Sequence, residues 1–120
     1  MTPSIVVNCT HGREETERAT LSFVVGNVSA TAEQATAVLL TCEGVWLATK
    51  GYADGVHHDG LPVLTEVQAS FVAAGGEIWA CGACTGPRGI TEADLVPGAR
   101  IVSAAMVVEA MAGGARTLSF

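Results

Sequence analysis

The sequence predicts an α/β fold built on a mainly parallel sheet. Short runs rich in β-branched residues alternate with longer segments of helical periodicity, as in repeated strand–helix–strand units. The first two runs each contain a continuous apolar stretch rather than an alternating pattern, which is typical of strands covered on both faces. The chain has 120 residues and shows no linker or internal repeat, so residues 1–120 are expected to form one domain.

The first half of the chain contains two predicted strands. Residues 4–9 (SIVVNC) form the first, and Thr10-His11-Gly12 turns the chain after it. A helix follows from about Arg13, with two glutamates in its first turn, where the helix dipole favours negative charge. Its apolar stripe is expected at Leu21, Val24, Val25 and Val28. Residues 35–42 (ATAVLLTC) form the second strand, followed by a short helix that runs into a glycine-rich loop.

The second half continues the alternation. Residues 61–74 have helical spacing and stop at two glycines, and residues 77–81 (EIWAC) form the third strand. Residues 91–94 (TEAD) resemble a capping box for a short helical turn. Residues 100–102 form the fourth strand, Ser103 caps a helix that runs to residue 112, and residues 115–120 form the last strand.

Composition excludes some classes of function. With a net charge of −6 and only six scattered Lys and Arg residues, the chain lacks the basic patch that nucleic-acid binding requires. No stretch approaches the roughly 20 apolar residues of a membrane span, and the N-terminus has no signal-peptide pattern, so a cytoplasmic location is expected. Hydrophobic residues make up 49% of the chain and charged residues 15%, which favours an oligomer that hides apolar surface.

The cysteines follow the predicted strands. Cys9, Cys42 and Cys81 each end a strand, and ligands of open α/β sheets bind at that edge. Cys84 and His11 are placed just beyond it. Free cysteine also behaves as a small buried hydrophobe. That role is expected for Cys42, stays open for Cys9, and is the weaker interpretation for Cys81 and Cys84.

The segment after Cys81 favours a reactive thiol. Gly82, Gly86 and Pro87 leave backbone amides accessible to an anion, and Arg88 adds a positive charge. Amide donors and a nearby cation favour the thiolate form, which is the nucleophile. Arg88 can equally be an ordinary surface residue.

Three other chemistries compete for the Cys-x-x-Cys pair. A thioredoxin-type oxidoreductase has its motif after the first strand and before a long helix, whereas here it follows the third. A structural zinc site needs about four ligands, so the pair would need Cys9 and a histidine (His11, His57 or His58) as further ligands. The turn after the first strand contains neither a P-loop nor a dinucleotide motif, so a bound nucleotide or flavin is poorly supported. We expect no metal and no cofactor.

The segment ACGACTGPRGI, at a strand end in a chain of this length, resembles the DsrE/DsrF-like family of sulfur-relay proteins, which includes TusD-type sulfurtransferase subunits. The most specific element is a cysteine that ends the third strand, seven residues before Arg-Gly-Ile; here these are Cys81, Arg88, Gly89 and Ile90. The likeness covers essentially the whole chain.

The resemblance implies a flavodoxin-like three-layer sandwich with a mainly parallel five-stranded sheet, and assembly into homotrimers or homohexamers. It also implies that Cys81 accepts sulfur as a persulfide from a donor protein and passes it to an acceptor protein. Cys84 departs from the single cysteine of the sulfurtransferase subunits. It can act as a resolving thiol or form a redox pair with Cys81, so a thiol redox protein and a metal- or ligand-binding module remain alternatives.

Overall fold

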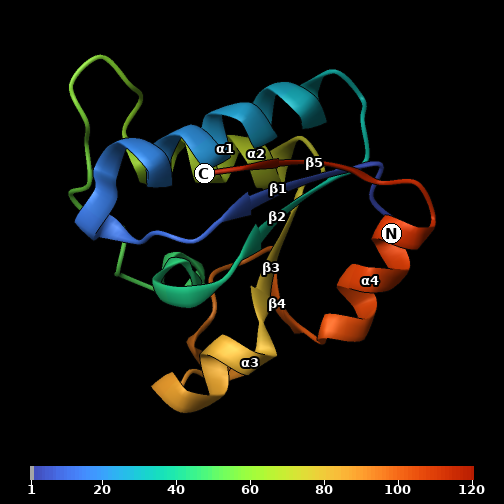
Figure 1. Ribbon diagram of the computed structural model, residues 1–120. Coiled ribbons are helices and arrows are strands. Elements are labelled where there is room, and N and C mark those ends of the chain that lie inside the picture. Colours follow the sequence, from blue (N-terminus) through green and yellow to red (C-terminus); the bar gives the residue numbers. More distant parts are fainter. Residues whose placement is uncertain (1) are drawn as a thin grey trace.

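Five parallel strands form the central sheet in a computed structural model that describes residues 2–120 (Figure 1). Their spatial order is β4-β3-β2-β1-β5, and every pair of neighbouring strands is parallel. The strands are β1 (Ile5–Cys9), β2 (Thr36–Leu40), β3 (Glu77–Cys81), β4 (Ala99–Val102) and β5 (Arg116–Ser119). The predicted α/β class, with its mainly parallel five-stranded sheet, is therefore confirmed.

Helices cover both faces of this sheet. Helices α1 (Thr16–Thr31) and α2 (Leu64–Ala73) lie on one face, α4 (Ala104–Ala112) lies on the other, and the short α3 (Gly82–Thr85) follows β3 (Figure 1). The connections also contain four 3-10 turns: η1 (Arg13–Glu15), η2 (Cys42–Ala48), η3 (Gly86–Arg88) and η4 (Glu92–Asp94). The layers are those of the expected three-layer sandwich. No helix among residues 2–120 is long and apolar enough to cross a membrane.

The caps read from the sequence are present. The Met106 amide donates to Ser103 Oγ at 3.3 Å, which fixes the start of α4. The capping box around η4 is complete, because Thr91 and Asp94 bond each other's backbone amides. These local bonds fix where η4 and α4 begin.

The larger core lies between the sheet and the α1/α2 layer. All five residues of β2 are buried, and Val38 and Leu40 point to this side. Phe23 of α1 meets Phe71 of α2 edge to face, with ring centroids 5.9 Å apart. Gly26 permits this close packing, since a Cβ there would lie 2.8 Å from a methyl group of Val38. A smaller core under α4 contains Trp79 of β3 and Val102 of β4.

Two sequence predictions about helices were wrong in part. The buried side of α1 consists of mostly small residues around Phe23, and Val28 of the predicted stripe is 65% exposed. Small side chains face the sheet because α1 packs closely against β2 and α2. Val24 and Val25 are half-buried against the same core, and Val28 is directed outward. Helix α2 begins at Leu64 rather than at residue 61, because the Leu61 amide closes a turn onto the His58 carbonyl at 3.0 Å.

The connections that follow β3 and β4 leave the sheet on opposite faces. After β3 the chain returns through Ile90 and Leu95, which pack in the core shared with α1 and α2. After β4 it crosses to α4 on the opposite face. The ends of β3 and β4 therefore flank the place where a parallel sheet opens to ligands.

Candidate functional site

Cys81 lies at the place where these connections diverge. It is the last residue of β3, pairs in register with Val102 of β4, and occupies the N-cap position of α3. Its thiol is free and half-buried, so it is neither locked in the core nor fully solvated. Gly82 follows because space is short: a Cβ there would lie 3.3 Å from the Val102 carbonyl oxygen. The predicted strand-end position of Cys81 is confirmed.

Cys84 contacts a residue that the sequence analysis set aside. The backbone amide of Cys42 donates to Cys84 Sγ at 3.1 Å. Cys42 does not end a strand, because β2 stops at Leu40 and Cys42 opens η2. The thiol of Cys42 is free and exposed, so the expectation of a small buried hydrophobe was also wrong. Its backbone has a φ of 52°, an unusual conformation for a residue with a side chain.

Arg88 connects the two cysteine segments. Its Nη1 donates to the Cys84 carbonyl at 3.1 Å, and its Nε donates to Glu43 Oε1 at 3.1 Å. Glu43 directly follows Cys42 in η2. The guanidinium is only partly exposed, with 28% of the side chain accessible. Arg88 thus bonds the backbone of one cysteine and the neighbour of another, and its charge is paired with a carboxylate.

Cys9 belongs to the core. Its side chain is completely buried at the end of β1, and its Sγ donates to the His11 carbonyl at 3.2 Å. Burial raises the pKa of this thiol above its ordinary value, so it stays neutral and shielded at neutral pH. The structure therefore favours the structural interpretation that the sequence left open, and Cys9 does not join the other thiols as a nucleophile.

The histidines do not assemble with the cysteines. His11 Nδ1 lies 2.9 Å from Thr10 Oγ1, beside the end of β1. His58 lies 3.3 Å from Glu17 at the start of α1, and His57 lies 2.8 Å from the Leu61 carbonyl. Across residues 2–120, no three His, Cys, Asp or Glu side chains come together in a way that could hold a metal ion. The ligand set required by the zinc alternative is therefore not formed.

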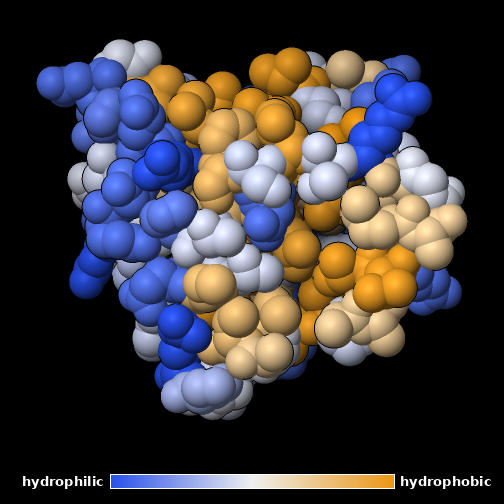
Figure 2. All heavy atoms as spheres, viewed as in Figure 1, coloured by the Kyte–Doolittle hydropathy of each residue, from blue (hydrophilic) through white to orange (hydrophobic). Residues whose placement is uncertain are grey.

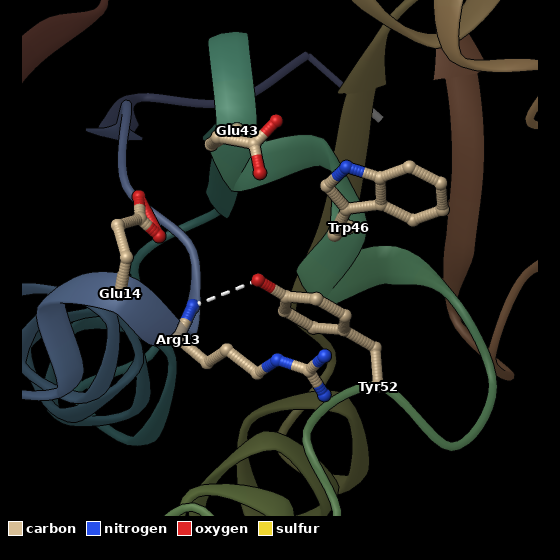
Figure 3. Close-up of a pocket in the computed structure, with 5 residues that line it drawn as sticks. All are labelled: Arg13, Glu14, Glu43, Trp46 and Tyr52. Carbon is tan, nitrogen blue, oxygen red and sulfur yellow. Dashed lines mark hydrogen bonds between the residues drawn. The ribbon is translucent and has the colours of Figure 1, made fainter.

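A pocket of about 500 Å³ opens beside the segment that carries Cys42 (Figure 3). It is lined by Arg13, Glu14, Glu43, Trp46 and Tyr52. Trp46 and Tyr52 stack with ring centroids 6.1 Å apart, and the Arg13 guanidinium lies 4.6 Å from the centre of the Tyr52 ring. The Arg13 amide also donates to the Tyr52 hydroxyl at 2.9 Å, which ties the turn after β1 to the loop after η2.

A second pocket also has Trp46 in its lining. It has a volume of about 390 Å³, and its lining includes Lys50, Arg88 and Asp94. Neither pocket was predicted from the sequence. Their place could have been inferred from the strand order, because the turn after the first strand and the segment after the second meet at one edge of a parallel sheet. The two pockets place aromatic and charged surface next to the cysteines.

This arrangement provides three accessible or half-buried thiols on two neighbouring segments, with Cys81 and Cys84 after β3 and Cys42 after β2. A thiol of this kind can attack an electrophilic sulfur and carry it as a persulfide. Two thiols within reach of one another can also close a disulfide.

Comparisons with known proteins agree with the fold. The chain superposes on the ychN protein of E. coli with a TM-score of 0.79, at 17% identity, over 98% of this chain and 99% of that one. It superposes on MTH1491 of Methanobacterium thermoautotrophicum with a TM-score of 0.73, at 18% identity, over 97% of each chain. At these identities the likeness concerns the fold.

One curated relative and a family model add sequence evidence. The chain is 29% identical over 99 residues to an uncharacterized protein, MJ0760 of Methanocaldococcus jannaschii. That match covers 82% of this chain but 36% of the relative, so the chain spans about a third of the relative's length. Residues 4–120 match the model of the DsrE/DsrF-like family. The chain therefore belongs to the DsrE/DsrF-like family, which is generally linked to sulfur relay.

Proposed function

We propose that this protein accepts sulfur as a persulfide on Cys81 and transfers it to an acceptor, as a sulfur carrier or sulfurtransferase. The observation that carries the proposal is the position of Cys81. A free, half-buried thiol ends β3 where the chain connections diverge, in a member of a family linked to sulfur relay. Binding sites of open parallel sheets form at such a place.

The proposed reaction is a thiol–persulfide exchange. The Cys81 thiolate attacks the outer sulfur of a donor persulfide, the sulfur–sulfur bond of the donor breaks, and the donor leaves as a thiolate. Cys81 then holds one additional sulfur. An acceptor thiolate removes that sulfur in the same way and restores the Cys81 thiolate. The exchange needs no cofactor or metal, because each sulfur–sulfur bond that breaks is replaced by another.

The surroundings of Cys81 support this chemistry. A half-buried position limits the access of water and small oxidants while it leaves room for a partner's cysteine. The pocket formed by Arg13, Trp46 and Tyr52 lies at the same edge, and its charged and aromatic groups suit contact with a donor or acceptor protein. A cytoplasmic location would suit the free thiols of Cys42, Cys81 and Cys84, because that compartment keeps thiols reduced.

Self-association is part of the proposal. Strand β5 lies at one edge of the sheet and all four of its residues are exposed. Leu118 of β5 is 50% exposed and Val28 of α1 is 65% exposed, and both line an apolar depression at that edge. Figure 2 shows further apolar surface over α4, where Val108 is 65% exposed. Apolar area of this kind favours contact with other copies of the chain, in the trimers or hexamers that the family resemblance implies.

Sulfur loading tests the assignment of Cys81. The purified, reduced protein is treated with an excess of a low-molecular-weight persulfide, free thiols and persulfides are alkylated while the donor is still present, and the peptides are mapped by mass spectrometry. Additional sulfur is expected on the Cys81 peptide and is expected to be lost in Cys81→Ser. Cys9→Ser is the matched control, since a buried thiol should not load. Equal loading of wild type and Cys81→Ser would contradict the proposal.

Sedimentation tests the oligomer separately. Val28→Lys changes an exposed side chain, so the stability of the fold should change by no more than about 0.5 kcal/mol. The variant is expected to sediment as a smaller species than wild type. Identical sedimentation of the two proteins would rule out this surface as the contact.

A further inference from the structure

We infer that Cys42 is the resolving thiol of this site: it pairs with Cys84 in a disulfide and thereby releases bound sulfur as sulfide. The inference rests on the proposed persulfide on Cys81 and adds a residue that the Cys-x-x-Cys motif does not contain. It also changes the expected disulfide, which would join η2 to α3 and would not join the two cysteines of the motif to each other.

The contact between the two segments is the first observation. Cys84 Sγ lies 3.1 Å from the backbone nitrogen of Cys42. Covalent geometry then limits the separation of the two Cα atoms to about 7.5 Å. Disulfides span Cα distances up to about 6.8 Å, so at most a small approach is needed. Because Cys42 is exposed, its thiol can turn toward Cys84 without displacing core side chains.

Arg88 holds the two cysteines in this relation. It donates to the Cys84 carbonyl and to Glu43, the residue after Cys42, at 3.1 Å in each case. Gly44 lets the same segment lie directly against the end of β1, because a Cβ there would lie 2.4 Å from the Cys9 carbonyl oxygen. The backbone around Cys42 is therefore fixed against both α3 and the end of β1, which keeps the approach distance small.

The two cysteines of the motif face different surroundings. The alternation of β3 directs Cys81 to the side of the sheet that carries Trp79 and α4. Cys84 packs against the core that the sheet shares with α1 and α2. The Cys84 sulfur accepts a hydrogen bond from the backbone amide of Cys42. This geometry favours Cys42 over Cys81 as the disulfide partner of Cys84.

Sulfur can nevertheless pass from Cys81 to Cys84. Cys81 is the N-cap residue of α3 and Cys84 is the third residue of that helix, a position that an N-cap side chain can reach. A persulfide extends a cysteine by about 2 Å. The Cys84 thiolate attacks the outer sulfur of the Cys81 persulfide, and the Cys81 thiolate leaves. Cys84 then carries the sulfur next to Cys42.

The resolving step balances without a further reagent. The Cys42 thiolate attacks the inner sulfur of the Cys84 persulfide, the bond to the outer sulfur breaks, and that sulfur leaves as hydrosulfide. The outer sulfur is reduced to sulfide while the two cysteine thiols are oxidised to a disulfide. A dithiol reductant then restores both thiols. The site would thus convert carried sulfur to sulfide whenever no acceptor removes it first.

The experiment follows sulfide release and disulfide position after loading with a low-molecular-weight persulfide. Wild type is compared with Cys42→Asn and Cys42→Ser, because asparagine tolerates the backbone conformation at this position and serine is closest in size. Excess donor is removed, released sulfide is measured, and peptides are mapped without reduction. Wild type is expected to release sulfide and to form the Cys42–Cys84 disulfide. Both variants are expected to retain the sulfur and to release sulfide at least about tenfold more slowly.

The outcomes separate this inference from the proposed function. A disulfide between Cys81 and Cys84, or equal sulfide release by wild type and both Cys42 variants, overturns the inference alone. Failure of the Cys42 variants to bind sulfur on Cys81 or Cys84 overturns the proposed function. Arg88→Lys tests the positioning role: it keeps the charge but loses the two-armed contact, so the Cys42–Cys84 disulfide should form more slowly once sulfur is bound, and an unchanged rate of disulfide formation would contradict that role.

Discussion

Oxidation of this protein should stabilise it by an amount that identifies the disulfide. Cys42 and Cys84 are 42 positions apart. In the chain-entropy description, closing a loop of that length stabilises the folded state by up to about 4 kcal/mol, whereas the loop of the Cys-x-x-Cys pair gives about 1.6 kcal/mol. A domain of this size changes its melting temperature by about 4 °C per kcal/mol. The Cys42–Cys84 disulfide should therefore raise the melting temperature by up to about 16 °C.

Denaturant unfolding measures the gain in folding free energy directly. The free energy of unfolding is determined for reduced protein and for protein oxidised by a mild thiol oxidant, with Cys42→Asn as the matched control that can only close the short loop. The oxidised wild type should gain clearly more than the oxidised variant, and its m-value should fall because a cross-linked unfolded chain exposes less surface. Equal gains in wild type and Cys42→Asn would refute the reasoning.

Three further predictions concern single residues near the site. Cys9→Ala should lower the free energy of unfolding by roughly 1 kcal/mol, because it empties part of a buried position, and should leave Cys81 loading unchanged; reduced loading would contradict a purely structural role. Gly82→Val should destabilise by about 1–3 kcal/mol in thermal unfolding, because its Cβ alone would lie 3.3 Å from a backbone carbonyl oxygen, and a change within error would refute the close approach. Hydrogen bonds from Thr91 hold the pKa of Asp94 below its ordinary value, so this carboxylate stabilises the fold above pH 3.8 and the contribution is lost as the pH falls through the lowered pKa. Asp94→Asn should remove that part of the acid dependence in a pH series of melting temperatures, and an unchanged series would contradict the assignment.

The sequence predicted the sheet well because buried parallel strands have a distinctive composition. The run that became β3 was predicted with its observed bounds, and the caps at Ser103 and Thr91 were predicted from local hydrogen-bonding chemistry. These features depend on a few adjacent residues. Local information was therefore sufficient for the elements and for the place of Cys81.

The remaining features depend on contacts between distant segments. Cys42 resembled the end of an apolar strand, but β2 stops at Leu40. Cys42 has a positive φ and is exposed, and its backbone amide donates to Cys84. The exposed face of α1 was missed for a similar reason. Spacing alone does not reveal that Ala19 and Gly26 are needed on the buried side so that α1 can approach the sheet. The pockets beside Trp46 likewise form from segments that meet only in the folded chain.

The most direct test of the central claim is the position of bound sulfur in a chain that cannot resolve it. The double variant Cys42→Asn, Cys84→Ser is loaded with a persulfide donor, alkylated and mapped by mass spectrometry. One additional sulfur atom is expected on Cys81, stable until a thiol acceptor is added and then transferred to that acceptor. A folded double variant that binds no sulfur, or binds it only on Cys9, would contradict the claim that Cys81 is the sulfur-carrying residue.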